Sequence, residues 1–356
     1  MKDNSIIVCC LNDSYINPNL IENAISIIKK VYAINNKDNK ERINIINYKI
    51  NNIHVFKKEK NYYYFFSLFL LINLIIQILS QIKGIDTFRT LNSYYSEITI
   101  KINGIENQSI ISQLYSSLPD EIYINEIKAS EKQNSIFSTN NETIIRMIWF
   151  NKLQTCDFML NDLSNITEID LSKFDSSEVE SMHYMFHGCY SLESINFTNF
   201  DTSNVIYMSG TFQDCLKLKT LDISTFNTSK VTNMHYMFGN CYSLTSLDIS
   251  HFNTTLVTDL GGLLFNCYSL TSIDLSSFLT INNNYLDYML YNCSFKYIDI
   301  TNFNTSKVIL MKYMFFNCTS LEQLNLSNFD INSVIDMESM FYNCKKLEYI
   351  NLRNAI

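Results

Sequence analysis

The sequence is poor in the residues that build several common functional sites. It has only seven Gly and two Pro among 356 residues, and it contains neither G-x-x-x-x-G-K nor G-x-G-x-x-G, so the usual phosphate-cradling loops are excluded. None of its ten cysteines forms a C-x-x-C pair, which argues against a zinc site or a redox motif. Its five histidines share no arrangement with Asp and Ser that would indicate a nucleophilic triad. We therefore expect no enzyme, no metal site and no bound cofactor.

Basic residues are also in the minority. There are 27 Lys and Arg against 35 Asp and Glu, which gives a formal net charge of -8. Because nucleic-acid binding depends on Lys and Arg contacts with phosphates, a mildly acidic chain is no candidate for it. With 47% hydrophobic residues, the chain is long enough for two or three ordinary domains.

One long stretch lacks charge altogether. From Tyr62 to Ile82 there are 21 uncharged residues, and a helix of that length spans roughly 31 Å, about one hydrocarbon core. Lys57, Lys58 and Lys60 precede it, so the positive-inside rule places residues 1–60 in the cytosol and the remainder outside. The sequence thus predicts a single-pass plasma-membrane protein of type II topology, with a signal anchor at 61–83. The alternative is a buried helix in a cytoplasmic protein.

The second half of the chain is an internal repeat. Seven cysteines recur at steps of 26 residues, with one step of 25, namely Cys189, Cys215, Cys241, Cys267, Cys293, Cys318 and Cys344. A fixed period in this range is typical of a solenoid, in which each unit buries its apolar face against its neighbours. Equivalent residues of adjacent coils would lie about 4.8 Å apart. We expect the thiols to be free and buried in that interior.

Each repeat divides into two patterns. In "SKVTNMHYMFGNC", the residues Val231, Met234, Met237, Phe238 and Cys241 follow spacings of 3, 3, 1 and 3, which predicts one face of a helix. Thr228 or Ser229 would be its N-cap. In "LTSLDIS", Leu247 and Ile249 alternate with Asp248, which predicts a short half-buried strand. One strand and one helix per unit predict an α/β leucine-rich-repeat solenoid of about eight coils.

The unit "FNTSKVTNMHYMFGNCYSLTSLDIS" resembles the repeat of BspA-like leucine-rich-repeat surface proteins, which occur in bacteria and several protist lineages. The resemblance covers about residues 155 to 356. It implies an extracellular or surface-displayed right-handed solenoid that acts in adhesion or recognition, without catalytic residues. Two units, over residues 255 to 300, depart from the pattern, because Leu260 and Leu263 replace the Met positions and Asn283 replaces a Val.

The repeats suggest four regions along the chain. We expect a cytosolic segment at 1–60, a transmembrane helix or signal anchor at 61–83, a β-rich cap at 84–150 and the solenoid at 151–356. Alternating apolar and polar residues at 96–104 and 120–129, together with 144–150, predict the strands of the cap. The last coil has no evident cap of its own, which leaves a face for oligomerisation.

The outward position of the predicted strands is the candidate ligand site. Its residues are Asp170, Asn196, Asp222, Asp248, Asp274, Asp299, Asn325 and Asn351. Neighbouring carboxylates in such a column repel one another, and a bound cation or a basic ligand would relieve that repulsion. A hydroxyl column at Ser224, Ser250 and Ser276 runs beside it.

Two functions fit this reading. The first is a cell-surface recognition or adhesion glycoprotein that binds a protein or glycan through this face. Its sequons at Asn227, Asn253 and Asn304 lie in turns and are the most suitable glycosylation acceptors. The second is an intracellular leucine-rich-repeat scaffold for protein–protein interaction.

Overall fold

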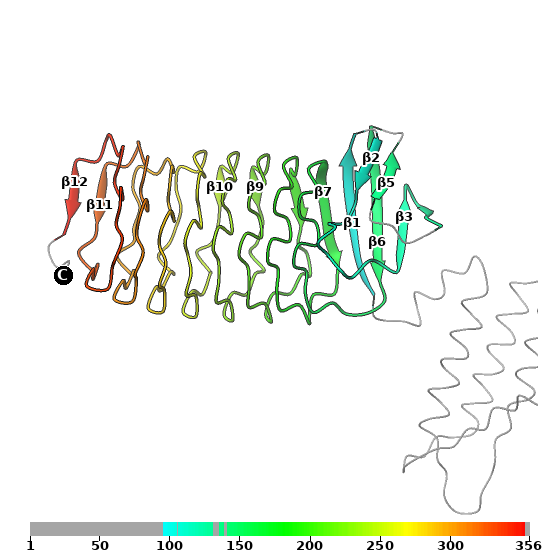
Figure 1. Cartoon of the computed structure of the whole chain (residues 1–356), viewed down its shortest axis with the longest axis horizontal. Helices are drawn as coiled ribbons and strands as arrows, with labels where there is room; N and C mark the ends of the chain where they lie inside the picture. The colour runs from blue at the N-terminus through cyan, green and yellow to red at the C-terminus, as the bar shows by residue number, and fades with distance from the viewer. Residues whose placement is uncertain (1–94, 105, 131–134, 139–140, 353–356) are drawn as a thin grey trace, which may run out of the picture. The chain divides into compact units, whose positions relative to one another are not determined.

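The described part of the chain is built from strands and turns. The computed structural model describes residues 95–104, 106–130, 135–138 and 141–352, which belong to one unit, Tyr94–Ile356. These residues form strands β1 to β12 and contain no helix (Figure 1). The expected α/β leucine-rich-repeat solenoid with a helix in each repeat and a transmembrane helix is therefore wrong.

No helix of the described residues is long and apolar enough to cross a membrane. The segment Tyr62–Ile82, in which the sequence predicts a span, lies outside the described residues. The described residues thus provide no span for the expected single-pass type II topology, and we withdraw the plasma-membrane location and the signal anchor. The cytoplasmic alternative gains no support from this finding.

A six-stranded sheet opens the described unit. Its strands, in the order β4-β3-β6-β1-β7-β8, are Ile127–Lys128, Glu121–Ile124, Glu142–Trp149, Ser96–Asn103, Ile166–Lys173 and Ser194–Asn196. All neighbours are antiparallel except β7 and β8, which are parallel. Strands β2 (Glu106–Ser109) and β5 (Ser135–Ser138) form a separate antiparallel pair. Strands therefore occupy all three segments of the region expected to be β-rich.

A cluster of charges ties this sheet together. The buried carboxylate of Glu97 in β1 lies 3.3 Å from Arg146 of β6 and 3.1 Å from Lys173 of β7. The Arg146 guanidinium also lies 4.1 Å from the centre of the Tyr123 ring. A buried carboxylate is tolerated only when it is paired, and here each of the two neighbouring strands provides one cation that pairs with Glu97.

Beyond β7 the chain winds into coils that stack side by side (Figure 1). The short strands β9 (Thr220–Leu221) with β10 (Ser246–Leu247), and β11 (Gln323–Asn325) with β12 (Tyr349–Asn351), pair in parallel. At a second position in each coil, one residue forms an isolated parallel β-bridge with the equivalent residue of each neighbouring coil. That series is Thr155, Ser181, Tyr207, Asn233, Asp259, Tyr285, Leu310 and Asp336.

The segment expected to be a helix is a chain of turns. The backbone amides of Met182 and Tyr184 donate to the carbonyls of Tyr207 and Ser209 in the next coil, and both hydrogen bonds are 2.9 Å long. The next amide along the chain, that of Met185, closes a turn on the carbonyl of Met182 at 3.1 Å. In an α-helix every such amide would bond four residues back within its own segment. Alternate amides are instead used to join neighbouring coils.

Two left-handed residues in each repeat interrupt any helix. They stand four positions apart, with φ between 50° and 70°. The first position is Phe158, Tyr184, Gly210, Tyr236, Gly262, Tyr288, Tyr313 and Ser339. The second is Asp162, Gly188, Asp214, Asn240, Asn266, Asn292, Asn317 and Asn343. Gly, Asn and Asp adopt this conformation at the lowest cost, which accounts for their use at the second position.

The interior is made of ladders of equivalent residues, most of them apolar and many of them identical. Val231, Met234, Met237, Phe238 and Cys241, which the sequence places on one face, are all fully buried. A second ladder consists of the buried residues Phe174, Phe200, Phe226, Phe252, Phe278, Phe303 and Phe329. These side chains share one face although the backbone that carries them is not helical.

The repeated cysteines are free thiols with a structural use. The Sγ of Cys241 donates to the carbonyl of Phe212 at 3.2 Å, and the Sγ of Cys267 to that of Phe238 at 3.1 Å. Each thiol thereby joins its coil to the one before it. Burial raises the pKa of the Cys241 thiol well above its ordinary value, so the thiol stays protonated and able to donate.

A ladder of buried threonines joins the coils at another corner. The hydroxyl of Thr228 accepts the backbone N–H of Asn253 at 2.8 Å and donates to the carbonyl of the same residue at 3.1 Å. Thr202 does the same for Asn227. Thr228 therefore accepts a hydrogen bond from a backbone N–H, as an N-cap would, but that N–H belongs to the next coil.

Replacing Thr228 with Val should lower the free energy of unfolding by about 1 to 2 kcal/mol, because both backbone groups of Asn253 lose their partner. Chemical denaturation of the full-length chain would measure it. The matched control is Ser229→Ala, since the exposed Ser229 hydroxyl makes no hydrogen bond with any other described residue. Equal midpoints for the two variants would contradict the assigned role.

The coils over residues 255 to 300 are the least regular. No strand is assigned between β10 and β11 among the described residues. Asn283 is fully buried, and neither its amide nitrogen nor its amide oxygen has a hydrogen-bond partner there. The coils whose sequence departs from the repeat pattern are thus the ones that lack paired strands and contain a buried amide without hydrogen bonds.

Candidate functional site

The candidate ligand column lies along one exposed face of the stacked coils. Asp170 pairs in register with Asn196, and Asn325 with Asn351. Seven of its eight residues are exposed, and Asn351 is half-buried. Two of its Asn side chains donate along the column, Asn196 to Asp170 and Asn351 to Asn325, each at 3.0 Å.

Each acidic residue of the column is held by the residue two positions later. The carboxylate of Asp248 accepts the backbone N–H of Ser250 at 3.0 Å and its hydroxyl at 2.7 Å. Asp222 has the same two partners in Ser224. These hydrogen bonds lower the pKa of both carboxyl groups below the ordinary value. The hydroxyl column therefore orients the acidic column and keeps it charged.

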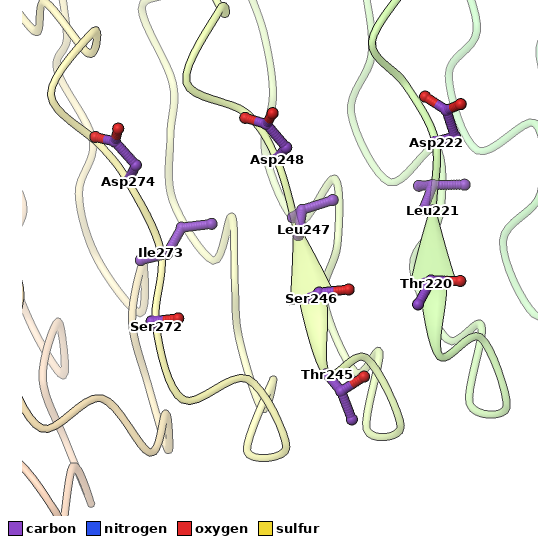
Figure 2. A pocket seen from close by; sticks show the side chains of 10 residues that line it. All are labelled: Thr220, Leu221, Asp222, Thr245, Ser246, Leu247, Asp248, Ser272, Ile273 and Asp274. Atoms are coloured by element: carbon purple, nitrogen blue, oxygen red, sulfur yellow. The ribbon is translucent and has the colours of Figure 1, made fainter.

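Three adjacent coils form a shallow groove at the centre of this face (Figure 2). One row is acidic, with Asp222, Asp248 and Asp274, and all three project from the same side of their strands. The middle row is aliphatic, and the row on the far side carries hydroxyls. Those two rows are Leu221, Leu247 and Ile273, and Thr220, Ser246 and Ser272, with Thr245 beside them.

The electrostatics of the groove are uniformly negative. Hydrogen bonds from Ser276 lower the pKa of Asp274, whereas the charges of Asp248 and Asp299 act to raise it. The neighbouring carboxylates are thus close enough to repel one another. Among the described residues no group of three or more His, Cys, Asp or Glu is placed to hold a metal ion. The groove can instead offer carboxylate acceptors on one side and hydroxyl groups on the other, while Leu221 and Leu247 between them are buried.

The sequence indicated only part of this groove. It placed the acidic residues in one column, but the row of Thr220, Ser246 and Ser272 and the aliphatic floor were not recognised as part of the site. A signal was present, because a hydroxyl residue precedes the acidic position by two residues in three successive repeats. An alternating pattern alone does not say that three coils curve into a depression.

The three glycosylation candidates lie in exposed turns at another corner of the coils. Asn227, Asn253 and Asn304 each accept, through Oδ1, the backbone N–H of the residue two positions on, at 3.0 to 3.1 Å. The side-chain nitrogen that a glycan would modify is not used in those bonds. Glycosylation of these three residues therefore stays a prediction.

Comparison with known proteins places the repeats in a family. Neither the curated proteins nor the solved structures contain a match to the chain. A family model matches residues 154–278, 208–297 and 263–354, which together cover more than half of the chain. The chain belongs to the family described as Mycoplasma protein of unknown function, DUF285.

Proposed function

We propose that the chain is a recognition protein that binds a protein or glycan ligand through the groove on its exposed strand face. The resemblance of its repeats to BspA-like leucine-rich-repeat proteins supports this class of function. The observation that carries the proposal is the set of three in-register rows contributed by consecutive coils (Figure 2). Because the backbone of each coil is bonded to its neighbours, the rows are held in place before a ligand arrives.

The chemistry of the rows defines the ligand. Asp222, Asp248 and Asp274 present charged acceptors, so the ligand must bring hydroxyl, amide or cationic donors to that side. The hydroxyls of the opposite row both donate and accept, and of the aliphatic row between them only Ile273 is partly exposed. A sugar ring with its hydroxyls, or a peptide with polar and basic side chains, satisfies both polar rows.

The test is a binding experiment with the full-length chain on two defined libraries. One is an array of glycans of known composition, and the other is a phage library of random peptides. Selected ligands are then titrated against the double variant Asp248→Asn with Asp274→Asn. We expect affinity to fall about tenfold or more, because two charged acceptors are lost.

The matched control is the double variant Asp201→Asn with Asp330→Asn. These two carboxylates also accept the backbone N–H of the residue two positions on, at 2.8 and 2.9 Å, but they lie outside the groove. The control has the same change of charge and should bind as the wild type does. The proposal fails if neither library yields a ligand, or if every ligand binds both double variants equally.

A further inference from the structure

One end of the stacked coils is uncovered in the described part of the chain. The last described coil, over residues 331–352, contains β12, whose one described neighbour is β11 (Figure 1). We call the uncovered face of this coil the β12 end. At the opposite end of the coils, the edge of β7 is already paired with β1 of the six-stranded sheet. A strand edge with open backbone groups is a template for pairing with another chain.

Side chains that are buried in the preceding coils are exposed at the β12 end. Met337 is 42% exposed and Leu352 is 56% exposed, whereas their equivalents one coil earlier, Met311 and Leu326, are 0% and 3% exposed. Phe341, in the turn segment, is only partly buried against the core. The β12 end therefore presents a cross-section of the hydrophobic core.

This coil also lacks the side chain that would hold a further coil of the same kind. In six preceding coils a buried hydroxyl bonds to the backbone of the next coil, and these residues are Ser176, Thr202, Thr228, Thr254, Thr280 and Thr305. Ile331 stands at the seventh position and is 39% exposed. Asn343 and Cys344, by contrast, still bond back to the coil before. A further regular coil would find no hydroxyl at Ile331, which suits an apolar contact instead.

The turn segment of the β12 end presents hydrogen-bond donors. In the preceding coil the amides of Tyr313 and Phe315 donate to carbonyls of the last described coil at 2.9 and 3.0 Å. The equivalent amides, those of Ser339 and Phe341, have no acceptor among the described residues. A row of N–H groups therefore points away from the coils on this side.

The strand side of the same end presents acceptors. The carbonyl of Glu322 accepts the N–H of Glu348 from the next coil at 3.0 Å. The corresponding carbonyl of Glu348 receives no hydrogen bond from the described residues, and β12 beside it is an edge strand. Ile350 of β12 and Phe341 of the turn segment both pack against the core, which thus lies between the donor side and the acceptor side.

We propose that the β12 end is the docking site for the same end of a second copy of the chain, with the turn segment of each copy against β12 of the other. A two-fold axis makes both contacts at once, because each copy brings the donors that the other lacks. The exposed side chains of Ile331, Met337 and Leu352 are then removed from water. Since both copies use the same face, the assembly closes as a dimer.

Other occupants fit this face less well. A single strand from another protein would pair with β12 but would leave the N–H row of the turn segment without acceptors. A head-to-tail contact between copies would need an open edge at the opposite end, where β1 already covers β7. The dimer contact is separate from the strand-face groove, and the inference does not depend on the proposed ligand.

The experiment is sedimentation equilibrium of the full-length chain over a wide range of concentrations, and we expect a monomer–dimer equilibrium. Leu352→Asp should raise the dissociation constant about tenfold or more, because it places an unpaired carboxylate in a desolvated contact. The matched control is Leu256→Asp, since Leu256 is 48% exposed but lies in an inner coil. It should dimerise as the wild type does, and melting curves should show that both variants are folded.

Alkylation of Cys344, followed by peptide mass spectrometry, ties the association to this face. Among the described cysteines Cys344 alone is half-buried, and the others are buried. In the wild type its alkylation should slow as the protein concentration rises, whereas in Leu352→Asp it should not. The proposal is overturned if the chain is monomeric at every concentration, if Leu352→Asp and Leu256→Asp associate equally, or if alkylation of Cys344 does not depend on concentration. None of these outcomes bears on ligands selected for the groove.

Discussion

Replacement of Phe212 by alanine is expected to lower the free energy of unfolding by about 3 to 5 kcal/mol, the largest loss that a single substitution should cause in the coils. The Phe212 ring is fully buried. It stacks between Phe186 at 5.5 Å and Phe238 at 5.6 Å, and Phe197 meets it edge-on at 6.0 Å. Its removal takes stacking contacts from two neighbouring coils and leaves a cavity that rigid ladders cannot close.

Denaturation of the full-length chain would measure this loss, with Tyr190→Ala as the control. Tyr190 is also aromatic and lies in the coil before Phe212, but it is exposed to solvent. We expect the control to change the midpoint only slightly. If Phe212→Ala unfolded at the same denaturant concentration as Tyr190→Ala, the stacked phenylalanines would not be a major source of stability.

The opposite change is expected at Asn283. Replacing it with Val should raise the free energy of unfolding by about 2 to 3 kcal/mol, because a buried amide without partners is removed and an apolar side chain is added. The equivalent positions already show that Val fits, since Val179, Val205, Val231, Val257 and Val308 are fully buried there. The backbone bond of residue 283 to Thr280 does not involve the side chain.

The neighbouring substitution Asn282→Val provides the control. The Asn282 amide donates to the carbonyl of Thr255 at 2.9 Å and accepts from Lys307 at 2.7 Å, so its loss should lower stability slightly. Thermal unfolding of both variants and of the wild type would measure these two changes in stability. An unchanged or lower melting temperature for Asn283→Val would mean that an internal water satisfies this amide.

The period and the buried residues of the repeat were open to prediction from the sequence. A recurrence at 26 residues requires equivalent side chains to meet, and the Met, Phe and Cys positions are buried accordingly. The column from Asp170 to Asn351 was also predictable, because alternation along a strand separates its two faces.

The prediction of a helix in each repeat was wrong for a physical reason. Spacings of 3, 3, 1 and 3 put Val231 to Cys241 on one side of a helix, but a chain of turns with left-handed residues at Tyr236 and Asn240 places the same side chains inward. Hydrophobic spacing does not distinguish the two backbones. The difference lies in where alternate amides donate, and here the next coil provides their acceptors.

The rows of the groove differ in how much of them the sequence indicated. The acidic row of the groove follows from strand alternation, whereas its aliphatic and hydroxyl rows depend on how three coils lie together. That Gly262 seats a ring from the preceding coil is a tertiary fact with no local signal.

The uniform bonding from each coil to the next has a consequence for how such chains lengthen. The regular units offer equivalent backbone donors, acceptors and buried side chains on their two sides, so duplication of such a unit would insert a coil that matches both neighbours. A 25-residue step between Cys293 and Cys318 is also accommodated, so the period tolerates small errors of recombination. The reach of the protein can therefore be set by copy number, at about 4.8 Å for every unit added.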